Sequence, residues 1–469
     1  MKKTKIVATI GPSSKEKIIL EDMIINGMDV ARFNMKYASL SFVSDIIYKI
    51  RDIDRKLKTN TAIIMDLEGP SIKINKILDD KAYFDKNTKI RIYMEELLGD
   101  STKFSVTYSK LNEDVKTNTI INIYKGNVEL KVLEKTEEYI LCEVTKEGYI
   151  KSDSDVVVDS TISLPFISRK DRESIEFATK EKVDYIGLSL VRSAENVLEI
   201  NDLLIEHNNN HTAIISIIET KESIDEIDEI IRLSDGIMLD RESLGVEIPP
   251  ERNPSIQKSL INKCHLNSKV SLMITEMESE FDDIRPSKAE ISDISRAICD
   301  GVDSVVLTGE TTVGKYPVGT INKMKKIAEA SELDVNYNEF LDRAYRTDTQ
   351  DITGVIAYSV VESSTKVKPI AIVIPTMNGY TAKKISRYKP SCPIIALTPN
   401  SLVAKSLGLY YGIVPVLIEE PKSLDTIIKI ARKEVENRFI IHEGDTIIIT
   451  GGFPFKEVKH TNFMKIEEL

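Results

Sequence analysis

The feature that most constrains this sequence of 469 residues is a repeated alternation of short apolar runs with longer amphipathic stretches. Eight of the runs have the length and composition of buried parallel strands. The amphipathic stretches between them, such as Leu40–Leu57 and Arg169–Lys182, have the spacing of surface helices. Eight strands that alternate with helices predict a closed (β/α)₈ TIM barrel, whose functional sites lie on the loops after the strands. The eight predicted strands are Lys5–Ile10, Asp29–Phe33, Ala62–Asp66, Tyr185–Leu190, Ala213–Ile218, Gly236–Leu239, Lys269–Ile274 and Ser304–Leu307.

An open doubly wound sheet is the main alternative for such an alternation. That fold would lead us to expect a glycine-rich phosphate turn after the first strand. The residues there, Gly11-Pro12-Ser13-Ser14, do not form this motif. The sequence therefore favours the barrel.

Two segments depart from the barrel pattern. From Asn75 to Leu164 the sequence shows short strands and turns, which predicts a small β domain inserted in a barrel loop, where lids over active sites commonly lie. After Leu333 the alternation resumes in what we expect to be a separate C-terminal α/β domain with a mostly parallel sheet. The predicted domains are a first part of the barrel at 1–74, the inserted β lid at 75–164, a second part of the barrel at 165–333, and the C-terminal domain at 334–469.

Composition and charge narrow the classes of partner. The net charge of −11 argues against nucleic acid or an anionic membrane, because phosphates repel an acidic surface. No run approaches the roughly 20 apolar residues of a membrane span. The N-terminal residues enter a predicted strand at once, without the apolar region of a signal peptide. We therefore expect a cytoplasmic protein. Its four cysteines lie far apart in the sequence, which fits reduced thiols, and they are Cys142, Cys264, Cys299 and Cys392.

One motif imitates a phosphate-binding P-loop. Gly309 and Gly314-Lys315 have the P-loop spacing, but Tyr316 stands where the motif needs a hydroxyl for magnesium, and Pro317 follows it. The five histidines show no metal-binding spacing either. The glycine spacing therefore does not predict a phosphate-binding loop, and the histidines do not predict a metal site.

A set of motifs along most of the chain is more specific than the P-loop spacing or the histidines. These motifs resemble those of the pyruvate kinase family. The motifs occur in one order, from residue 4 nearly to the C-terminus, and the similarity is weakest in the inserted β domain. They are Thr4-Lys5-Ile6-Val7-Ala8-Thr9-Ile10-Gly11-Pro12, Val30-Ala31-Arg32-Phe33-Asn34, Asp66-x2-Gly69-Pro70, Ser234-Asp235-Gly236-Ile237-Met238, Leu244-Gly245-Val246-Glu247-Ile248-Pro249, Ile274-Thr275-Glu276-Met277, Arg285-Pro286-x2-Ala289-Glu290, Thr308-Gly309-Glu310-Thr311, Ile356-Ala357-Tyr358-Ser359 and Tyr388-Lys389-Pro390-Ser391-Cys392-Pro393.

The resemblance implies a barrel with a mobile lid and a C-terminal regulatory domain, assembled as a tetramer. The family reaction transfers phosphate from phosphoenolpyruvate to ADP with Mg²⁺, and usually K⁺, and gives pyruvate and ATP. Such a reaction depends on positioned charges, so the charged residues of the site decide whether it can run.

Several positions of the family site are retained, as the resemblance implies. Arg32 falls where the family contacts phosphate, Glu219 where it has one magnesium carboxylate, and Thr275 on its proton route. Asn34 and Asp66 fall on two ligand positions for the monovalent cation. The implied substrate-binding residues are Arg32, Ser189, Arg192, Arg241 and Thr275.

Other positions of the family site are changed. The catalytic lysine is Ile217 and the second magnesium aspartate is Ser243, while the neighbouring Glu242 offers only a displaced carboxylate. Lys36 replaces a serine ligand of the monovalent cation, so an ammonium stands where K⁺ would bind and K⁺ is not expected. Lys73 replaces the substrate arginine and stays cationic without bidentate geometry. We expect weak Mg²⁺ binding, because this ion demands near-ideal octahedral geometry.

The changes leave three hypotheses open. The first is a catalytically inactive or strongly impaired family member, retained as a structural or regulatory subunit that assembles with an active pyruvate kinase as a homo- or hetero-tetramer. The second is an active pyruvate kinase with a rebuilt site, and the retained Thr275 is the best argument for it. The third is a small-molecule sensor that uses the surviving anion pocket. We favour the first, because the lysine and a metal ligand are lost together.

Overall fold

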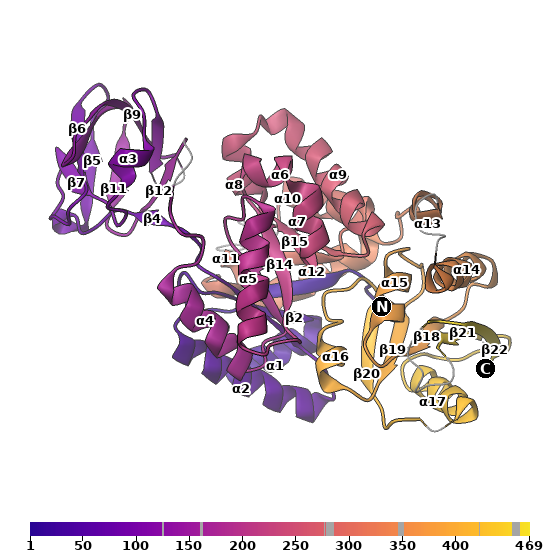
Figure 1. Cartoon of the computed structure of the whole chain (residues 1–469). Helices are drawn as coiled ribbons and strands as arrows, with labels where there is room; N and C mark the ends of the chain where they lie inside the picture. The colour runs from indigo at the N-terminus through magenta and orange to yellow at the C-terminus, as the bar shows by residue number, and fades with distance from the viewer. Residues whose placement is uncertain are drawn as a thin grey trace. The chain divides into compact units, whose positions relative to one another are not determined.

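The computed structural model describes residues 1–123, 126–159, 163–275, 277, 286–345, 351–421, 423–452 and 460–469 (Figure 1). The chain divides into two compact units. The first consists of Met1–Leu67, Glu173–Arg241 and Pro250–Leu469, and the second of Glu68–Arg172 and Glu242–Pro249. Within the described residues no helix is long and apolar enough to cross a membrane.

Eight parallel strands of the first unit form a closed barrel, as predicted. Their order around the barrel is β1-β17-β16-β15-β14-β13-β3-β2. The ends of the strands differ from the predicted ones by at most two residues, because a short apolar run is the strongest local signal of a buried strand. The strands are β1 (Lys5–Thr9), β2 (Val30–Asn34), β3 (Ala62–Asp66), β13 (Tyr185–Leu188), β14 (Ala213–Ile218), β15 (Gly236–Leu239), β16 (Val270–Ile274) and β17 (Ser304–Leu307).

Helices follow the barrel strands along the chain. Some of them begin at a capping residue: the Ser39 hydroxyl accepts a hydrogen bond from the Phe42 N–H at the start of the helix after β2, and Ser287 and Glu290 form a capping box before β17. The helices are α1 (Lys17–Asn26), α2 (Leu40–Leu57), α4 (Arg169–Lys180), α5 (Ala194–Glu206), α6 (Lys221–Asp225), α7 (Ile227–Leu233), α8 (Arg241–Glu247), α9 (Asn253–Leu266), α10 (Lys288–Asp300), α11 (Gly309–Thr312) and α12 (Pro317–Ser331).

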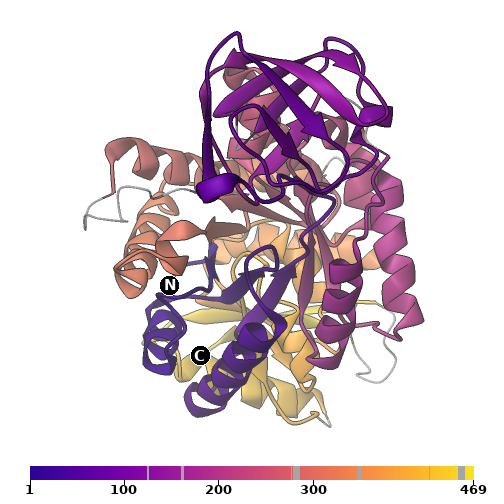
Figure 2. The ribbon, with the colours of Figure 1, turned by 90° about the vertical axis from the view of Figure 1, so that its left-hand side faces the viewer.

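The second unit is a small β structure. A seven-stranded sheet has the order β4-β12-β8-β9-β10-β6-β7, and β5 pairs with β11 in a separate ribbon. Alternating apolar residues of these strands, such as Ile90 and Ile92, form the unit's own buried core. In Figure 2 its strands are drawn in purple and wrap around one another. The strands are β4 (Ile72–Lys73), β5 (Lys81–Phe84), β6 (Lys89–Tyr93), β7 (Lys103–Ser105), β8 (Ile120–Ile123), β9 (Val128–Lys135), β10 (Tyr139–Lys146), β11 (Gly148–Lys151) and β12 (Asp155–Val158).

The C-terminal part of the first unit contains a five-stranded sheet of order β20-β19-β18-β21-β22. Its pairings are parallel except for β21 with β22, which confirms the predicted mostly parallel sheet. The strands are β18 (Ala371–Pro375), β19 (Ile394–Thr398), β20 (Ile413–Leu417), β21 (Thr446–Gly451) and β22 (Phe463–Glu468), and the helices are α13 (Tyr337–Tyr345), α14 (Ile352–Val367), α15 (Tyr380–Ser386), α16 (Ser401–Lys405) and α17 (Leu424–Glu436).

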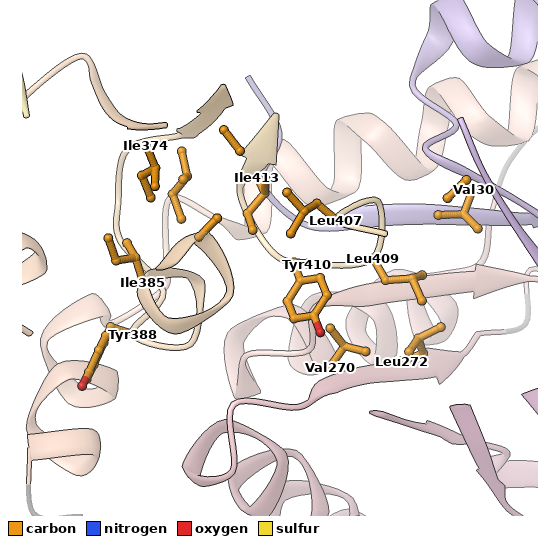
Figure 3. Packing of buried hydrophobic residues seen from close by; sticks show 14 of the residues in the cluster. Val30, Val270, Leu272, Ile374, Ile385, Tyr388, Leu407, Leu409, Tyr410 and Ile413 are labelled. Atoms are coloured by element: carbon orange, nitrogen blue, oxygen red, sulfur yellow. The ribbon is translucent and has the colours of Figure 1, made fainter. Parts of the chain in front are cut away.

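The C-terminal sheet and the barrel share one apolar core. Leu409 and Tyr410, which precede β20, pack against the barrel residues Val270 and Leu272 in this core (Figure 3). The hydroxyl of Ser304, the first residue of β17, donates to the Leu409 carbonyl at 2.9 Å. These contacts close the barrel at the end where its strands begin. The opposite end, where parallel strands finish, is therefore the one that carries a site.

Candidate active site

The position of the family's catalytic lysine is occupied by an apolar side chain inside the barrel. Ile217 is 3% exposed and lies in β14, in register with Met238 of β15. Both belong to the apolar core, together with Ile215, which precedes Ile217 by two residues. Because alternate residues of a strand share a face, Ile217 continues the inward-facing row of this strand. Its side chain brings neither charge nor proton to the rim.

Glu219 follows Ile217 by two residues and lies at the rim of the barrel. One of its oxygens, Oε1, accepts a hydrogen bond from the Leu190 N–H at 3.3 Å. Burial first, and then the negative charge of Asp240, raise the pKa of the Glu219 carboxyl to about 8, although the Leu190 N–H and Arg32 oppose the rise. The carboxyl therefore holds a proton at neutral pH in the absence of a bound cation.

Arg32 and Asp66 form a buried ion pair beside Glu219. The guanidinium Nε donates to Asp66 Oδ2 at 2.6 Å, and another guanidinium nitrogen donates to the Thr9 hydroxyl at 3.0 Å. Burial raises the pKa of Asp66, and Arg32 opposes this rise. The other carboxylate oxygen, Asp66 Oδ1, is buried and has no hydrogen-bond partner among the described residues. The structure thus brings together three predicted features: the phosphate-binding arginine, a cation ligand and the magnesium carboxylate.

The remaining residues of the predicted monovalent-cation site lie just after β2. The Asn34 Oδ1 accepts a hydrogen bond from the Lys36 backbone N–H at 3.0 Å. The Lys36 ammonium lies 5.8 Å from the centre of the Tyr37 ring. Asp66, the other predicted ligand, pairs with Arg32. The predicted loss of K⁺ binding stays a prediction.

The predicted substrate residues Ser189 and Arg192 lie in the turn after β13. The Ser189 hydroxyl donates to the Leu67 carbonyl at 2.8 Å, and the Arg192 N–H donates to Asn196 Oδ1 at 3.0 Å. The Nε of Arg192 is buried without a hydrogen-bond partner in the part of the chain that the structure describes. A buried guanidinium donor of this kind is suited to an anionic ligand.

Two further predicted residues, Thr275 and Arg241, follow β16 and β15. Thr275 is fully buried, and its hydroxyl donates to the Val306 carbonyl at 3.2 Å. Arg241 pairs with Asp293 at 3.1 Å. Two residues of the same family motifs, Glu276 and Arg285, lie outside the described residues.

Lys73, Glu242 and Ser243 belong to the second unit. Lys73 pairs with Glu68, which also contacts Lys170 at 2.9 Å. Burial would raise the pKa of Glu68, but the two lysines outweigh it and the pKa is lowered. Glu242 is exposed and Ser243 is half-buried in α8. The predicted use of Glu219 and Glu242 as joint metal ligands stays a prediction, because they belong to different units.

Asp240 also lies at the rim, although the resemblance to the family implies no role for it. It follows β15 directly, and its N–H donates to the Ile218 carbonyl at 3.3 Å. Its charge reaches Glu219, whose pKa it raises. The alternation after Met238 could have revealed it, since Asp240 is the next residue on the same face. Within the described ranges, no three His, Cys, Asp or Glu residues gather closely enough to hold a metal ion by themselves.

Comparisons with known proteins agree with the fold and the motifs. The family model described as "Pyruvate kinase, barrel domain" matches residues 1–321, and "Pyruvate kinase, alpha/beta domain" matches residues 355–467. A protein of Clostridium perfringens named pyruvate kinase is 38% identical over 474 residues and covers all of both chains. Proteins of the same name from Sporosarcina psychrophila and Staphylococcus saprophyticus are each 37% identical, across 99% of this chain and 80% of their own. The chain therefore belongs to the pyruvate kinase family.

Proposed function

We propose that this chain is a pyruvate kinase family protein in which transfer of phosphate from phosphoenolpyruvate to ADP is lost or strongly impaired. The observation that carries this proposal is the burial of Ile217 in the apolar interior of the barrel. The family lysine at this position would provide a cation for the developing enolate, and an isoleucine side chain cannot. Ile217 therefore cannot supply this positive charge at any step of the reaction.

A second change weakens the metal site. Glu219 supplies one carboxylate at the rim, whereas position 243 carries a neutral hydroxyl. When bound, Mg²⁺ would neutralise charge on the phosphoryl and enolate oxygens. We propose that the chain binds this ion weakly, with Glu219 as a ligand, and that Lys36 makes K⁺ unnecessary.

The purified chain tests the proposal with phosphoenolpyruvate, ADP, Mg²⁺ and K⁺. We expect phosphoenolpyruvate to stabilise the chain against heating through Arg32 and Arg192, because a ligand that binds the folded state raises Tm. We expect pyruvate to form only very slowly in the same mixture.

An active pyruvate kinase with a rebuilt site is the second candidate. The full-length similarity to proteins named pyruvate kinase favours it more directly than it favours loss of activity. The retained Thr275 and Arg32 also favour it. Rapid formation of pyruvate by the wild-type chain would establish this candidate and overturn the first.

For an impaired chain we propose a structural or regulatory role in the cytoplasm, in an oligomer with an active pyruvate kinase. The barrel is closed and the C-terminal sheet is complete, so the surfaces that build an assembly can persist without catalysis. A subunit of this kind shifts the conformational equilibrium of its partner through contacts that differ between the partner's states.

Co-expression of a tagged copy with the active pyruvate kinase of the same organism should yield mixed oligomers. Native mass spectrometry of the co-purified material would give their stoichiometry. We also expect the mixed oligomers to differ from the pure enzyme in Tm or in KM for phosphoenolpyruvate. Mixing the two proteins after separate purification is the control for assembly during synthesis. If only separate homo-oligomers form, with unchanged kinetics, the regulatory role is wrong.

A further inference from the structure

Two stretches of the second unit, residues 68–73 and 168–172, are joined to each other next to the points where the chain passes between the units. The larger part of the second unit begins at Glu68 and ends at Arg172. Asp171 Oδ1 accepts a hydrogen bond from the Glu68 N–H at 2.9 Å, and Oδ2 accepts one from the Ser168 hydroxyl at 2.7 Å. Asp171 is 1% exposed, so one buried carboxylate holds both stretches.

Glu68 joins the two stretches in the opposite direction. Its carboxylate pairs with the ammonium of Lys170, in the second stretch, at 2.9 Å, and with that of Lys73, at the end of the first stretch. Burial would raise the pKa of Glu68, but the two lysines outweigh it and the pKa is lowered. Glu68 is therefore charged at neutral pH and is shared between two cations.

The ion pair of Glu68 with Lys73 spans a turn. Gly69, inside the turn, has a φ of +73°, which glycine adopts without strain. Before the turn, the Leu67 N–H donates to the Gly187 carbonyl of the first unit at 2.8 Å. After it, Lys73 belongs to β4, which pairs with β12 in the sheet of the second unit. The ion pair therefore closes the turn that leads from the first unit into this sheet.

Glu68 can release Lys73 and still keep a cationic partner, because Lys170 pairs with the same carboxylate. The side chain of Lys73 is 22% exposed, so water and small ligands reach it. A partly exposed ion pair contributes little to stability, and an anion can therefore compete for its cation. Such competition weakens the apparent affinity for the anion in proportion to the fraction of chains in which the lysine is held.

We propose that Glu68 is an ionic latch, which holds the Lys73 ammonium and fixes the turn between them until an anionic ligand takes over the lysine. The proposal deepens the proposed function and rests on it for the identity of the anion, which is phosphoenolpyruvate. The latch itself does not depend on turnover, because its contacts are made without any ligand.

Hydrogen exchange of the ligand-free chain, measured by mass spectrometry, tests the latch. Glutamine keeps the size of the glutamate side chain and removes its charge. We therefore expect Glu68→Gln to accelerate exchange at least fivefold in peptides that contain residues 68–73, and to leave peptides of β9 and β10 unchanged. Added salt should accelerate the same peptides of the wild type by screening the ion pair, and should change them little in the variant. Glu176→Gln is the matched control, since it removes an equal charge at an exposed position of α4.

Calorimetry with phosphoenolpyruvate, without ADP, tests the release of Lys73. We expect Glu68→Gln to bind this ligand at least threefold more tightly than the wild type. Lys73→Gln should weaken binding more in the Glu68→Gln background than in the wild type, where Glu68 already holds the lysine.

The latch is wrong if residues 68–73 exchange no faster in Glu68→Gln than in Glu176→Gln. Its release by the ligand is wrong if Lys73→Gln weakens binding equally in both backgrounds. If none of the variants binds phosphoenolpyruvate, the proposed ligand is contradicted, whereas the exchange rates still decide the latch. Rapid formation of pyruvate would overturn the proposed loss of activity and would leave both readouts of the latch unaffected.

Discussion

Substitution of Ile217→Lys together with Ser243→Asp should raise the rate of pyruvate formation more than either substitution alone. One electrostatic group of this kind is typically worth about 10²–10³ in rate. The lysine would supply the cation for the enolate and the aspartate a second magnesium ligand at the family position. We expect each single variant to remain slow, because groups that act as a unit do not contribute independently.

We expect the interior of the barrel to accept this lysine. The new ammonium would point toward the rim, where Glu219 lies two residues further on the same face and Asp240 beside it. A buried charge with such partners is far less costly than an isolated one. Ile217→Met is the matched control, since it has a similar size and no charge. If the double variant is no faster than the chain with Ile217→Met, the loss of the lysine does not explain the loss of activity.

Glu219→Gln should make the metal-free protein more stable, and increasingly so as the pH rises from 5 to 8. Burial and Asp240 raise the folded-state pKa of Glu219 from its ordinary value of 4.5 to about 8. Between these values the folded state keeps a proton that the unfolded state releases. The free energy of unfolding therefore falls as the pH rises through this window. Since one pKa unit corresponds to about 1.4 kcal/mol, the cumulative effect is on the order of a few kcal/mol.

Denaturant unfolding in EDTA at several pH values measures this effect. The difference in free energy of unfolding between Glu219→Gln and the wild type should be small at pH 5 and should grow toward pH 8. Glu242→Gln is the control, because Glu242 is exposed. A difference that does not change with pH would show that Glu219 is ionised in the folded state and that its environment has been misjudged.

The barrel could be predicted from the sequence because its signal is local. Each strand is a short apolar run, and the helices between them have amphipathic spacing, so the order of elements leaves few topologies. The position of Arg32, Asp66 and Glu219 toward one rim followed from the same rule, since each lies in the second half of a parallel strand or directly after it.

Features that depend on pairing between distant segments could not be predicted. The Arg32–Asp66 ion pair and the orphaned Asp66 Oδ1 require side-chain geometry. The effect of Asp240 on the pKa of Glu219 depends on the register of β14 with β15, which a single sequence does not specify. The packing of Leu409 against the beginning of the barrel strands likewise joins segments more than 100 residues apart.

The steady-state rate of the wild-type chain tests the central claim most directly. The purified protein would be assayed with phosphoenolpyruvate, ADP, Mg²⁺ and K⁺ beside the Clostridium perfringens relative named pyruvate kinase, with pyruvate measured in the same coupled reaction. We predict a turnover orders of magnitude below about 10 s⁻¹, the median for enzymes. A turnover near 10 s⁻¹ or above, reached without any substitution at Ile217 or Ser243, would contradict the account.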